Sequence, residues 1–205
     1  MIPRYQRILF VILLLAALVM AGVLLHLRQR AHQRLLAGED SSPTKAPEVA
    51  PAEQSTLLVA NDADGSLLVQ ARSLPLPADP SARARVLIGN LLDLYASPGA
   101  AHPVSGGAAG VAQVFLLPVP GTKNSDQQLA VVNLTSNFAA SHPSGLETET
   151  LTVLSICGTL RANLPKVTEV RFLVDGQQRP NLAGHADLTR TYLTADAVPT
   201  GGSSQ

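Results

Sequence analysis

Hydrophobic residues are most concentrated near the N-terminus, where residues 8–27 form a run of 20 residues without a charged side chain. A helix of that length spans about 30 Å, which matches the hydrocarbon thickness of a bilayer. Cleaved signal peptides carry a shorter apolar stretch of about 7–15 residues, and no cysteine directly follows the run to carry a lipid. We therefore predict an uncleaved transmembrane helix from Ile8 to Leu27, preceded by a short tail, residues 1–7.

The hydrophobic pattern is lost after this run and returns near residue 56. Residues 28–55 hold a basic juxtamembrane stretch and then a segment rich in Pro, Ala, Ser and Glu, which is typical of a flexible linker. Residues 194–205 are similarly loose in composition, and we expect a disordered tail there. The pattern thus predicts one folded domain, residues 56–193.

The domain opens with two apolar runs, residues 55–61 and 66–74, on either side of Asp64 and Gly65. Apolar runs that flank an Asp-Gly pair are typical of a β-hairpin. The helical spacing of apolar residues that follows, with Asp79 as a possible cap, predicts a helix.

The second half of the domain predicts strands at 111–119 and 128–134, then a loop, a helix and a last strand. A Ser-x-x-Glu pattern at Ser144 is typical of a capping box, and the helix would run to about Asn163. Residues 166–176 alternate apolar and polar side chains, as in a strand with one buried face. The predicted order is β-β-α-β-β-α-β, which indicates a two-layer α+β sandwich of one mixed sheet and two helices, preceded by the transmembrane helix.

Composition and charge narrow the function classes. Aromatic residues make up only 3% of the chain and Trp is absent, so we expect an aliphatic core, and the composition is poorly suited to a platform for stacking bases. From residue 55 onward, nine Lys and Arg stand against eleven Asp and Glu. Because no basic stripe forms, we expect no nucleic-acid partner.

Two local features invite a chemical interpretation that their context does not support. Cys157 is the single cysteine and lies among apolar residues at helical spacing, which is typical of a small core residue. The glycine-rich residues 99–110 lack the Lys-Ser/Thr pair of a phosphate-binding loop and precede a strand, where such loops precede a helix. We expect no phosphate binding and no cofactor.

The polar residues best suited to chemistry are His102, His142, His185, Asp175 and Asp187. In a strand, His185 and Asp187 would share a face, and with His142 they could form a metal site of the His-carboxylate type. The chain has no His-Glu-x-x-His or Gly-x-Ser-x-Gly pattern, so we favour solvated polar residues: no metal site, no catalytic site and no enzyme. An envelope hydrolase or metal-binding protein that uses His185 and Asp187 is the alternative hypothesis.

Asn133, Leu134 and Thr135 form an N-glycosylation pattern at the end of an apolar run. Both faces of this run are apolar, which is typical of a central strand covered on both sides. We therefore interpret Asn133 as the end of a strand that hydrogen bonds hold in place, and expect Phe138 to return to the core.

In order and spacing, these elements resemble the GerMN domain of bacterial sporulation and spore-germination proteins, over about residues 55–192. The resemblance rests on the hairpin Asp-Gly, a strand that leads to a Phe, a Thr-Leu pair on the second helix and a final Asp-Gly. These signature residues, which we expect to be structural, are Asp64, Gly65, Asn133, Phe138, Thr159, Leu160, Asp175 and Gly176.

The resemblance implies a non-catalytic interaction or assembly module of the bacterial cell envelope, with envelope proteins or peptidoglycan as partners and with association between copies. Family members are often lipoproteins, whereas this chain carries a transmembrane helix. Two arginines precede that helix and three closely follow it, a weak bias toward a cytoplasmic C-terminal side, but long C-terminal domains are translocated despite such a bias. We expect a single-pass protein of the inner membrane with its C-terminal domain outside the cytoplasm.

Overall fold

The computed structural model describes residues 19–20, 51–119 and 126–199. The chain divides into two compact units, Met1–Glu48 and Val49–Gln205. Of the predicted transmembrane span, only Val19 and Met20 are described, and the rest of the span lies outside the described residues. Within the described part, no helix combines the length and apolar character needed to cross a bilayer.

The domain begins with the predicted hairpin, formed by β1 (Ala52–Asn61) and β2 (Ser66–Pro75). In the turn, the Asp64 carboxylate accepts a hydrogen bond from the Ser66 backbone N–H at 3.0 Å. Gly65 has a φ of +67°, a conformation that favours glycine because it has no Cβ. The hairpin prediction is confirmed, with a strand that begins a few residues earlier than expected.

A second, separate sheet has four strands in the order β3-β4-β5-β6. The β4–β5 pair is parallel and the other two pairs are antiparallel, so this sheet is mixed. Its strands are β3 (Val111–Pro118), β4 (Gln128–Leu134), β5 (Val167–Val174) and β6 (Tyr192–Leu193). The prediction of one sheet that includes the hairpin is therefore wrong.

The described part of the domain has three α-helices, one more than predicted for the domain: α2 (Pro80–Tyr95), α3 (Ser136–Ser141) and α4 (Leu146–Asn163). Helix α2 begins as expected, because the Asp79 carboxylate accepts from the Ala82 N–H at 2.7 Å. The stretch expected as a loop after β4 forms α3, which Thr135 caps through its hydroxyl. Two short 3₁₀ turns, η1 (Gly107–Gly110) and η2 (Thr194–Asp196), complete the elements.

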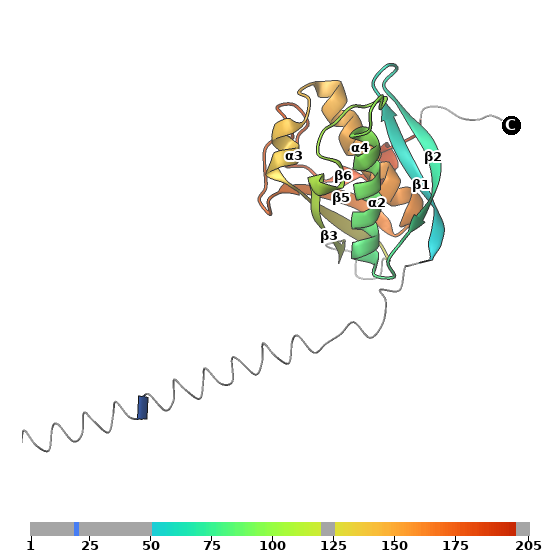
Figure 1. Ribbon diagram of the computed structural model, residues 1–205. Coiled ribbons are helices and arrows are strands. Elements are labelled where there is room, and N and C mark those ends of the chain that lie inside the picture. The colour runs from blue at the N-terminus through green and yellow to red at the C-terminus, as the bar shows by residue number, and fades with distance from the viewer. Residues whose placement is uncertain (1–18, 21–50, 120–125, 200–205) are drawn as a thin grey trace, which may run out of the picture. The chain divides into compact units, whose positions relative to one another are not determined.

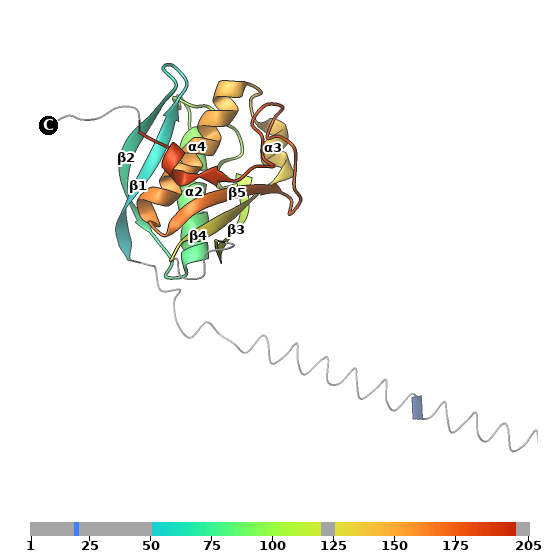
Figure 2. The same ribbon diagram turned by 180° about the vertical axis from the view of Figure 1, so that it is seen from behind.

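The helices α2 and α4 lie between the hairpin and the four-stranded sheet (Figures 1 and 2). Helix α4 contacts β1 on one side and β5 on the other, and α2 contacts both β3 and β1. The α+β class is confirmed, but the domain has three layers where two were predicted. Pattern analysis missed the second buried face of α4 because that face is built from small polar side chains, among them Thr152, Ser155 and Thr159.

The ordered region is wider than the predicted limits of 56–193. Strand β1 starts at Ala52. At the other end, residues 194–199, expected as part of a disordered tail, pack on the domain: Thr194 and Ala197 are buried, and the Thr194 hydroxyl donates to the Val167 carbonyl at 3.0 Å. The remaining tail, residues 200–205, lies outside the described residues.

Candidate functional site

A chain of four polar side chains, here called the histidine relay, joins Asp62, His102, Thr152 and His142, of which the last three are buried and Asp62 is exposed. The Asp62 carboxylate lies 2.5 Å from Nδ1 of His102, whose Nε2 lies 2.7 Å from the Thr152 hydroxyl. On the other side of Thr152, Nε2 of His142 lies 2.8 Å from the same oxygen. Each member comes from a different segment, so only the folded domain brings the relay together.

Aromatic rings and burial shield the two histidines and Thr152 from solvent, whereas Asp62 is exposed at one end of the relay. The ring of Tyr95 meets His102 edge-on at 4.6 Å, and Phe138 meets His142 in the same way at 5.6 Å. Burial lowers the pKa of His142, although the Pro143 carbonyl at 2.7 Å from Nδ1 acts in the opposite direction. A carboxylate, an imidazole and a hydroxyl in series are the components of a nucleophilic triad. Since Thr152 is completely buried, a substrate has no access to this hydroxyl in the observed structure.

A second cluster surrounds Glu149, whose carboxylate is buried at the start of α4. The oxygen Oε2 accepts from the backbone N–H groups of Ala183, His185 and Ala186 at 2.8–3.0 Å. Oε1 accepts from the Gly145 N–H and lies 3.0 Å from Nδ1 of His185. Burial by itself would raise the pKa of Glu149, but these hydrogen bonds outweigh it and lower the pKa to about 2. Glu149 thus fixes the loop that follows β5 onto the helix.

This cluster determines what His185 and Asp187 do. They do not share a strand face: they lie in an irregular segment, where His185 faces Glu149 and the Asp187 carboxylate accepts from the N–H and hydroxyl of Thr189. His142, the proposed third ligand, belongs to the histidine relay. Within the described residues, no three His, Cys, Asp or Glu side chains come close enough to hold a metal ion. The alternative hypothesis therefore has no three-ligand set in this part of the chain.

Five signature residues lie at the ends of the hairpin and of β4 and β5, where they support the backbone. The Asn133 side chain accepts from the Gly176 N–H at 2.7 Å, which links the ends of the parallel strands β4 and β5. Asp175, which has a φ of +49°, accepts from the Ser136 N–H at the start of α3, and this bonding lowers its pKa. The prediction that hydrogen bonds hold Asn133 at a strand end agrees with this geometry. Asp64 and Gly65 form the hairpin turn described above.

The remaining signature residues hold helices in place. Thr159 accepts, through its hydroxyl, the backbone N–H of Leu58 in β1 at 2.9 Å. Leu160 and Phe138 are buried in the core. Cys157 is also completely buried, and burial raises the pKa of its thiol, which makes it an inert core residue.

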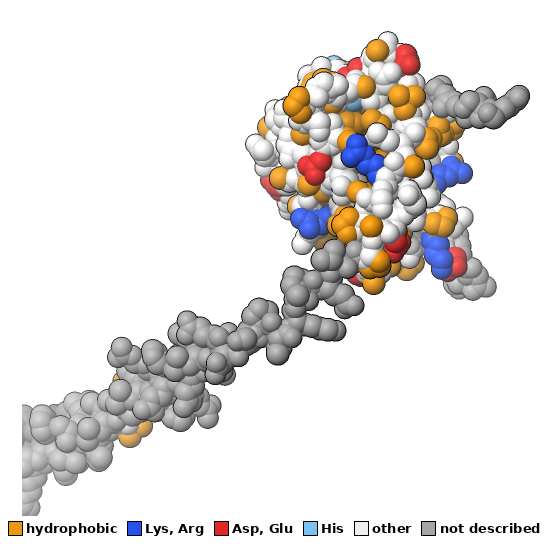
Figure 3. All heavy atoms as spheres, turned by 45° about the vertical axis from the view of Figure 1, so that its right-hand side comes forward, with side chains coloured by type: hydrophobic (Ala, Val, Ile, Leu, Met, Phe, Trp, Pro, Cys, Tyr) orange, Lys and Arg blue, Asp and Glu red, His pale blue; other side chains and the backbone are white. Residues whose placement is uncertain are grey.

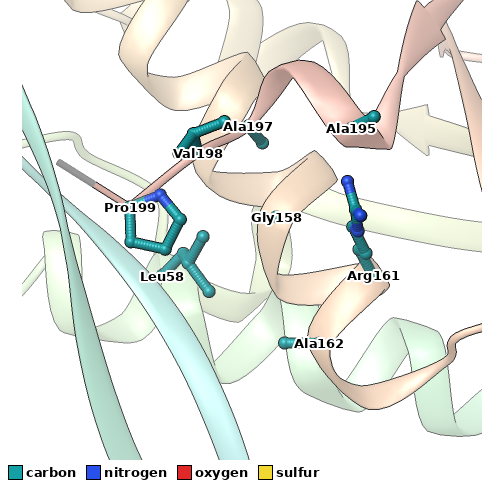
Figure 4. Close-up of a pocket in the computed structure, with 8 residues that line it drawn as sticks. All are labelled: Leu58, Gly158, Arg161, Ala162, Ala195, Ala197, Val198 and Pro199. Atoms are coloured by element: carbon teal, nitrogen blue, oxygen red, sulfur yellow. The ribbon is translucent and has the colours of Figure 1, made fainter.

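A mostly apolar groove of about 530 Å³ runs over α4 between β1 and the segment that follows β6. Figure 4 shows its lining, in which Arg161 is the one charged residue; the lining residues are Leu58, Gly158, Arg161, Ala162, Ala195, Ala197, Val198 and Pro199. Gly158 is essential to this packing, because a Cβ there would collide with the Leu58 side chain. The groove is shallow and open, and it offers one cation beside aliphatic walls.

A partly exposed apolar surface is the side of the four-stranded sheet that faces away from the helices, here called the outer sheet face; Leu129 at its middle is buried. Two rows of paired residues cross it, Phe115–Val131–Arg171 and Leu117–Leu129–Glu169–Leu193. At the two sides of the sheet, Phe115 is 46% exposed, Leu117 47% and Leu193 50%. A polar pair, Glu169 and Arg171, interrupts the aliphatic surface on β5. Such a surface is typical of a contact site.

Charged groups on one face of the domain show no concentration of a single sign. On the face drawn in Figure 3, basic and acidic side chains are scattered among hydrophobic and neutral ones. Ion pairs such as Arg83–Glu53, at 2.8 Å, use some of these charges locally. This face shows no basic stripe, and the sequence predicted none.

The fold and these clusters define a class of protein. It is an α+β domain in which a hairpin and a mixed sheet enclose two helices. The histidines and carboxylates of its polar clusters bond to other groups of the same domain. A family model described as "Germane: Sporulation and spore germination" matches residues 59–180. The match covers more than half of the chain, and the chain belongs to this family. No curated protein matches it.

Several solved structures are similar to this chain at low sequence identity. The tandem GerMN domains of the sporulation protein GerM from Bacillus subtilis are 17% identical, with a TM-score of 0.40 over 71% of this chain and 47% of that one. The chain thus spans about half the length of that structure. A putative lipoprotein from Clostridium perfringens is 15% identical, with a TM-score of 0.36 over 74% and 93% of the two chains. The first GerMN domain of GerM is 16% identical, with a TM-score of 0.36 over 66% and 92%.

Proposed function

We propose that this protein is a membrane-anchored, extracytoplasmic interaction module of the bacterial cell envelope and has no catalytic activity. The single observation that carries the proposal is the outer sheet face, where Phe115 and Leu117 on one side and Leu193 on the other are about half exposed. An exposed apolar patch on a domain of this size is a feature of protein contact sites.

The chemistry of the outer sheet face favours a protein partner over peptidoglycan. Its two rows contain only Phe115 as an aromatic residue and only Glu169 and Arg171 as charged ones. A glycan would require polar side chains that replace water on its hydroxyl groups, whereas aliphatic rows fit an apolar surface of another protein. A second copy of the chain is one such protein, in line with the association that the family resemblance implies.

The internal bonding of polar groups supports a binding role over the hydrolase alternative. His185 and Glu149 bond to each other, Asp187 bonds to Thr189, and Thr152 is buried. A nucleophile or general base must reach a substrate within hydrogen-bonding distance. His185, Glu149, Asp187 and Thr152 instead bond within the domain, where they hold loops and helices in place.

The test is site-specific photocrosslinking of the full-length chain in its own membrane. A photoreactive residue at position 115 or 117 is expected to give protein adducts, and one at the exposed position Arg72 on β2 provides the background. A Leu117→Glu substitution should abolish the adducts from position 115, because it places a charge in the aliphatic row. Adducts no stronger at 115 and 117 than at 72 would overturn the proposal, and an adduct of twice the chain mass would identify a second copy as the partner.

A further inference from the structure

The outer sheet face carries its two charged residues in adjacent rows. Glu169 and Arg171 lie two positions apart on β5, so their side chains leave the strand on the same side. The acidic row is Leu117–Leu129–Glu169–Leu193, and the basic row is Phe115–Val131–Arg171. Apart from these two charges, both rows are apolar. The rows are thus alike in their apolar members and opposite in charge.

Neither charge is neutralised by another charge of the described domain. Among the described residues, the Glu169 carboxylate has no hydrogen-bond or ion-pair partner. The Arg171 guanidinium donates to the uncharged Thr191 hydroxyl at 3.0 Å and has further N–H groups to donate. Glu169 is half-buried and Arg171 is exposed. Both side chains can therefore reach a charged group on a second surface.

A second copy of the outer sheet face offers the opposite charges. Two sheets that pack face to face lie about 10 Å apart, and copies of one chain commonly associate about a twofold axis. If this axis lies between the sheets and runs along the rows, β5 lies antiparallel to β5 of the second copy and the two rows change places. The acidic row of each copy then faces the basic row of the other. Glu169 meets Arg171, and Leu117 meets Phe115.

A twofold axis along the strands would leave the charges unmatched. Each row would then face itself across the interface. Glu169 would meet either another Glu169 or the apolar residues of its own row, and Arg171 would be placed in the same way. Contact between like charges and burial of a charge against aliphatic side chains are both unfavourable. The charge pattern therefore selects the axis along the rows.

We propose that the outer sheet face binds a second copy of this chain about a twofold axis along its rows, with two Glu169–Arg171 ion pairs between the copies. This inference rests on the proposed function, since it names the partner of the same surface. The apolar members of the rows supply the attraction, and the charges determine the orientation of the two copies.

The size of the sheet predicts a weak dimer. Strands β3, β4 and β5 have 7 or 8 residues each, and β6 has 2. With strands about 4.8 Å apart and about 3.3 Å per residue, the sheet covers about 400 Å². A standard interface buries about 800 Å² of each partner. We therefore expect an association that increases with protein concentration.

The test is co-capture of two differently tagged copies of the full-length chain, co-expressed in bacteria and extracted into detergent micelles. The unchanged chain is expected to retain its second copy. Arg171→Glu makes both rows acidic and Glu169→Arg makes both rows basic, so each variant paired with itself should give a yield at least about tenfold lower. The control is Arg72→Glu, the same change of charge on β2, which should leave the yield unchanged.

The decisive pairing combines the two variants. A copy with Arg171→Glu and a copy with Glu169→Arg again place acid opposite base at both positions, so the mixed pair should recover the yield of the unchanged chain. A chain that carries both substitutions should also pair with itself. Recovery would show at the same time that both variants fold, because the contact requires an intact sheet.

Three results would overturn the proposal. They are an unchanged chain that does not retain its copy, single variants that pair with themselves as well as the unchanged chain does, and a mixed pair that is no better than the self-pairs. The first of these needs no substitution and is independent of how a variant folds. The photocrosslinking experiment tests the binding role separately. Adducts with another protein at positions 115 and 117, without self-capture, would leave that role intact and exclude the second copy as the partner.

Discussion

At the scale of single residues, Glu149 shows how one buried carboxylate organises a loop that has little secondary structure. Three backbone N–H groups and a histidine surround it, which compensates the cost of burying its charge. The same carboxylate also bonds to Gly145 at the start of its own helix. The expected Ser144 cap is absent, and this carboxylate satisfies the first turn of the helix.

We predict that Glu149→Gln lowers the free energy of unfolding by about 2–3 kcal/mol near neutral pH, because an amide replaces an acceptor-only carboxylate that faces several donors. In the parent chain, the pKa of Glu149 falls from 4.5 to about 2 on folding. Its contribution is therefore complete above about pH 4.5 and is lost as the pH falls toward 2.

Urea unfolding at several pH values measures both effects. The matched control is Glu147→Gln, at an exposed position on the same turn of helix, for which we expect less than about 0.5 kcal/mol. A Glu149→Gln variant as stable as this control, with an unchanged acid transition, would refute the assignment.

At the scale of elements, the hairpin is joined to the helices by bonds along the edge of β1 that β2 leaves open. The N–H groups of Thr56, Leu58 and Ala60, at alternate positions, donate to Asn163, Thr159 and Tyr95. Strand edges are usually protected by charge or by short length. Here, side chains from α4 and α2 take the place of a neighbouring strand.

We predict that Thr159→Val destabilises the domain by about 1–3 kcal/mol, because the Leu58 N–H is left buried without an acceptor. Thr159→Ser retains the hydroxyl and should cost clearly less. Amide hydrogen exchange at Leu58 provides the local readout, with faster exchange in the Val variant only. Unchanged protection at Leu58 in that variant would show that the bond does not hold the hairpin.

The elements also show where pattern analysis succeeds. The hairpin, the cap of α2 and the extent of β4 were predictable, because turn residues, caps and alternation act within a few residues of one another. Helix α3 was not, since its six residues follow a sequence typical of a loop and depend on the Thr135 cap and on a bond to Asp175, 39 residues away.

At the scale of the whole molecule, the central expectation is that the domain is displayed outside the cytoplasm on a membrane anchor. The predicted anchor falls in the first unit, residues 1–48, which the structure describes only at residues 19–20. The expectation rests on the uncharged run of 20 residues and on the ease with which long C-terminal domains are translocated.

We predict that alkaline phosphatase fused after Gln205 is active in bacteria, because the enzyme folds productively only outside the cytoplasm, where its disulfides form. A β-galactosidase fusion at the same position, which requires the cytoplasm, is the control and should be inactive. The reverse pattern of activities would place the domain on the cytoplasmic side.

The sequence by itself determined most of the local elements, the α+β class and the family, because hydrophobic spacing, turn pairs and caps are properties of neighbouring residues. It also singled out the signature residues, without showing what they bind. Only the tertiary structure decided the separation into two sheets, the central position of α4 and the assembly of the histidine relay. The reason is distance along the chain: Leu58 and Thr159 are 101 residues apart, His102 and Thr152 are 50 apart, and no periodicity in the sequence records which distant polar groups will meet.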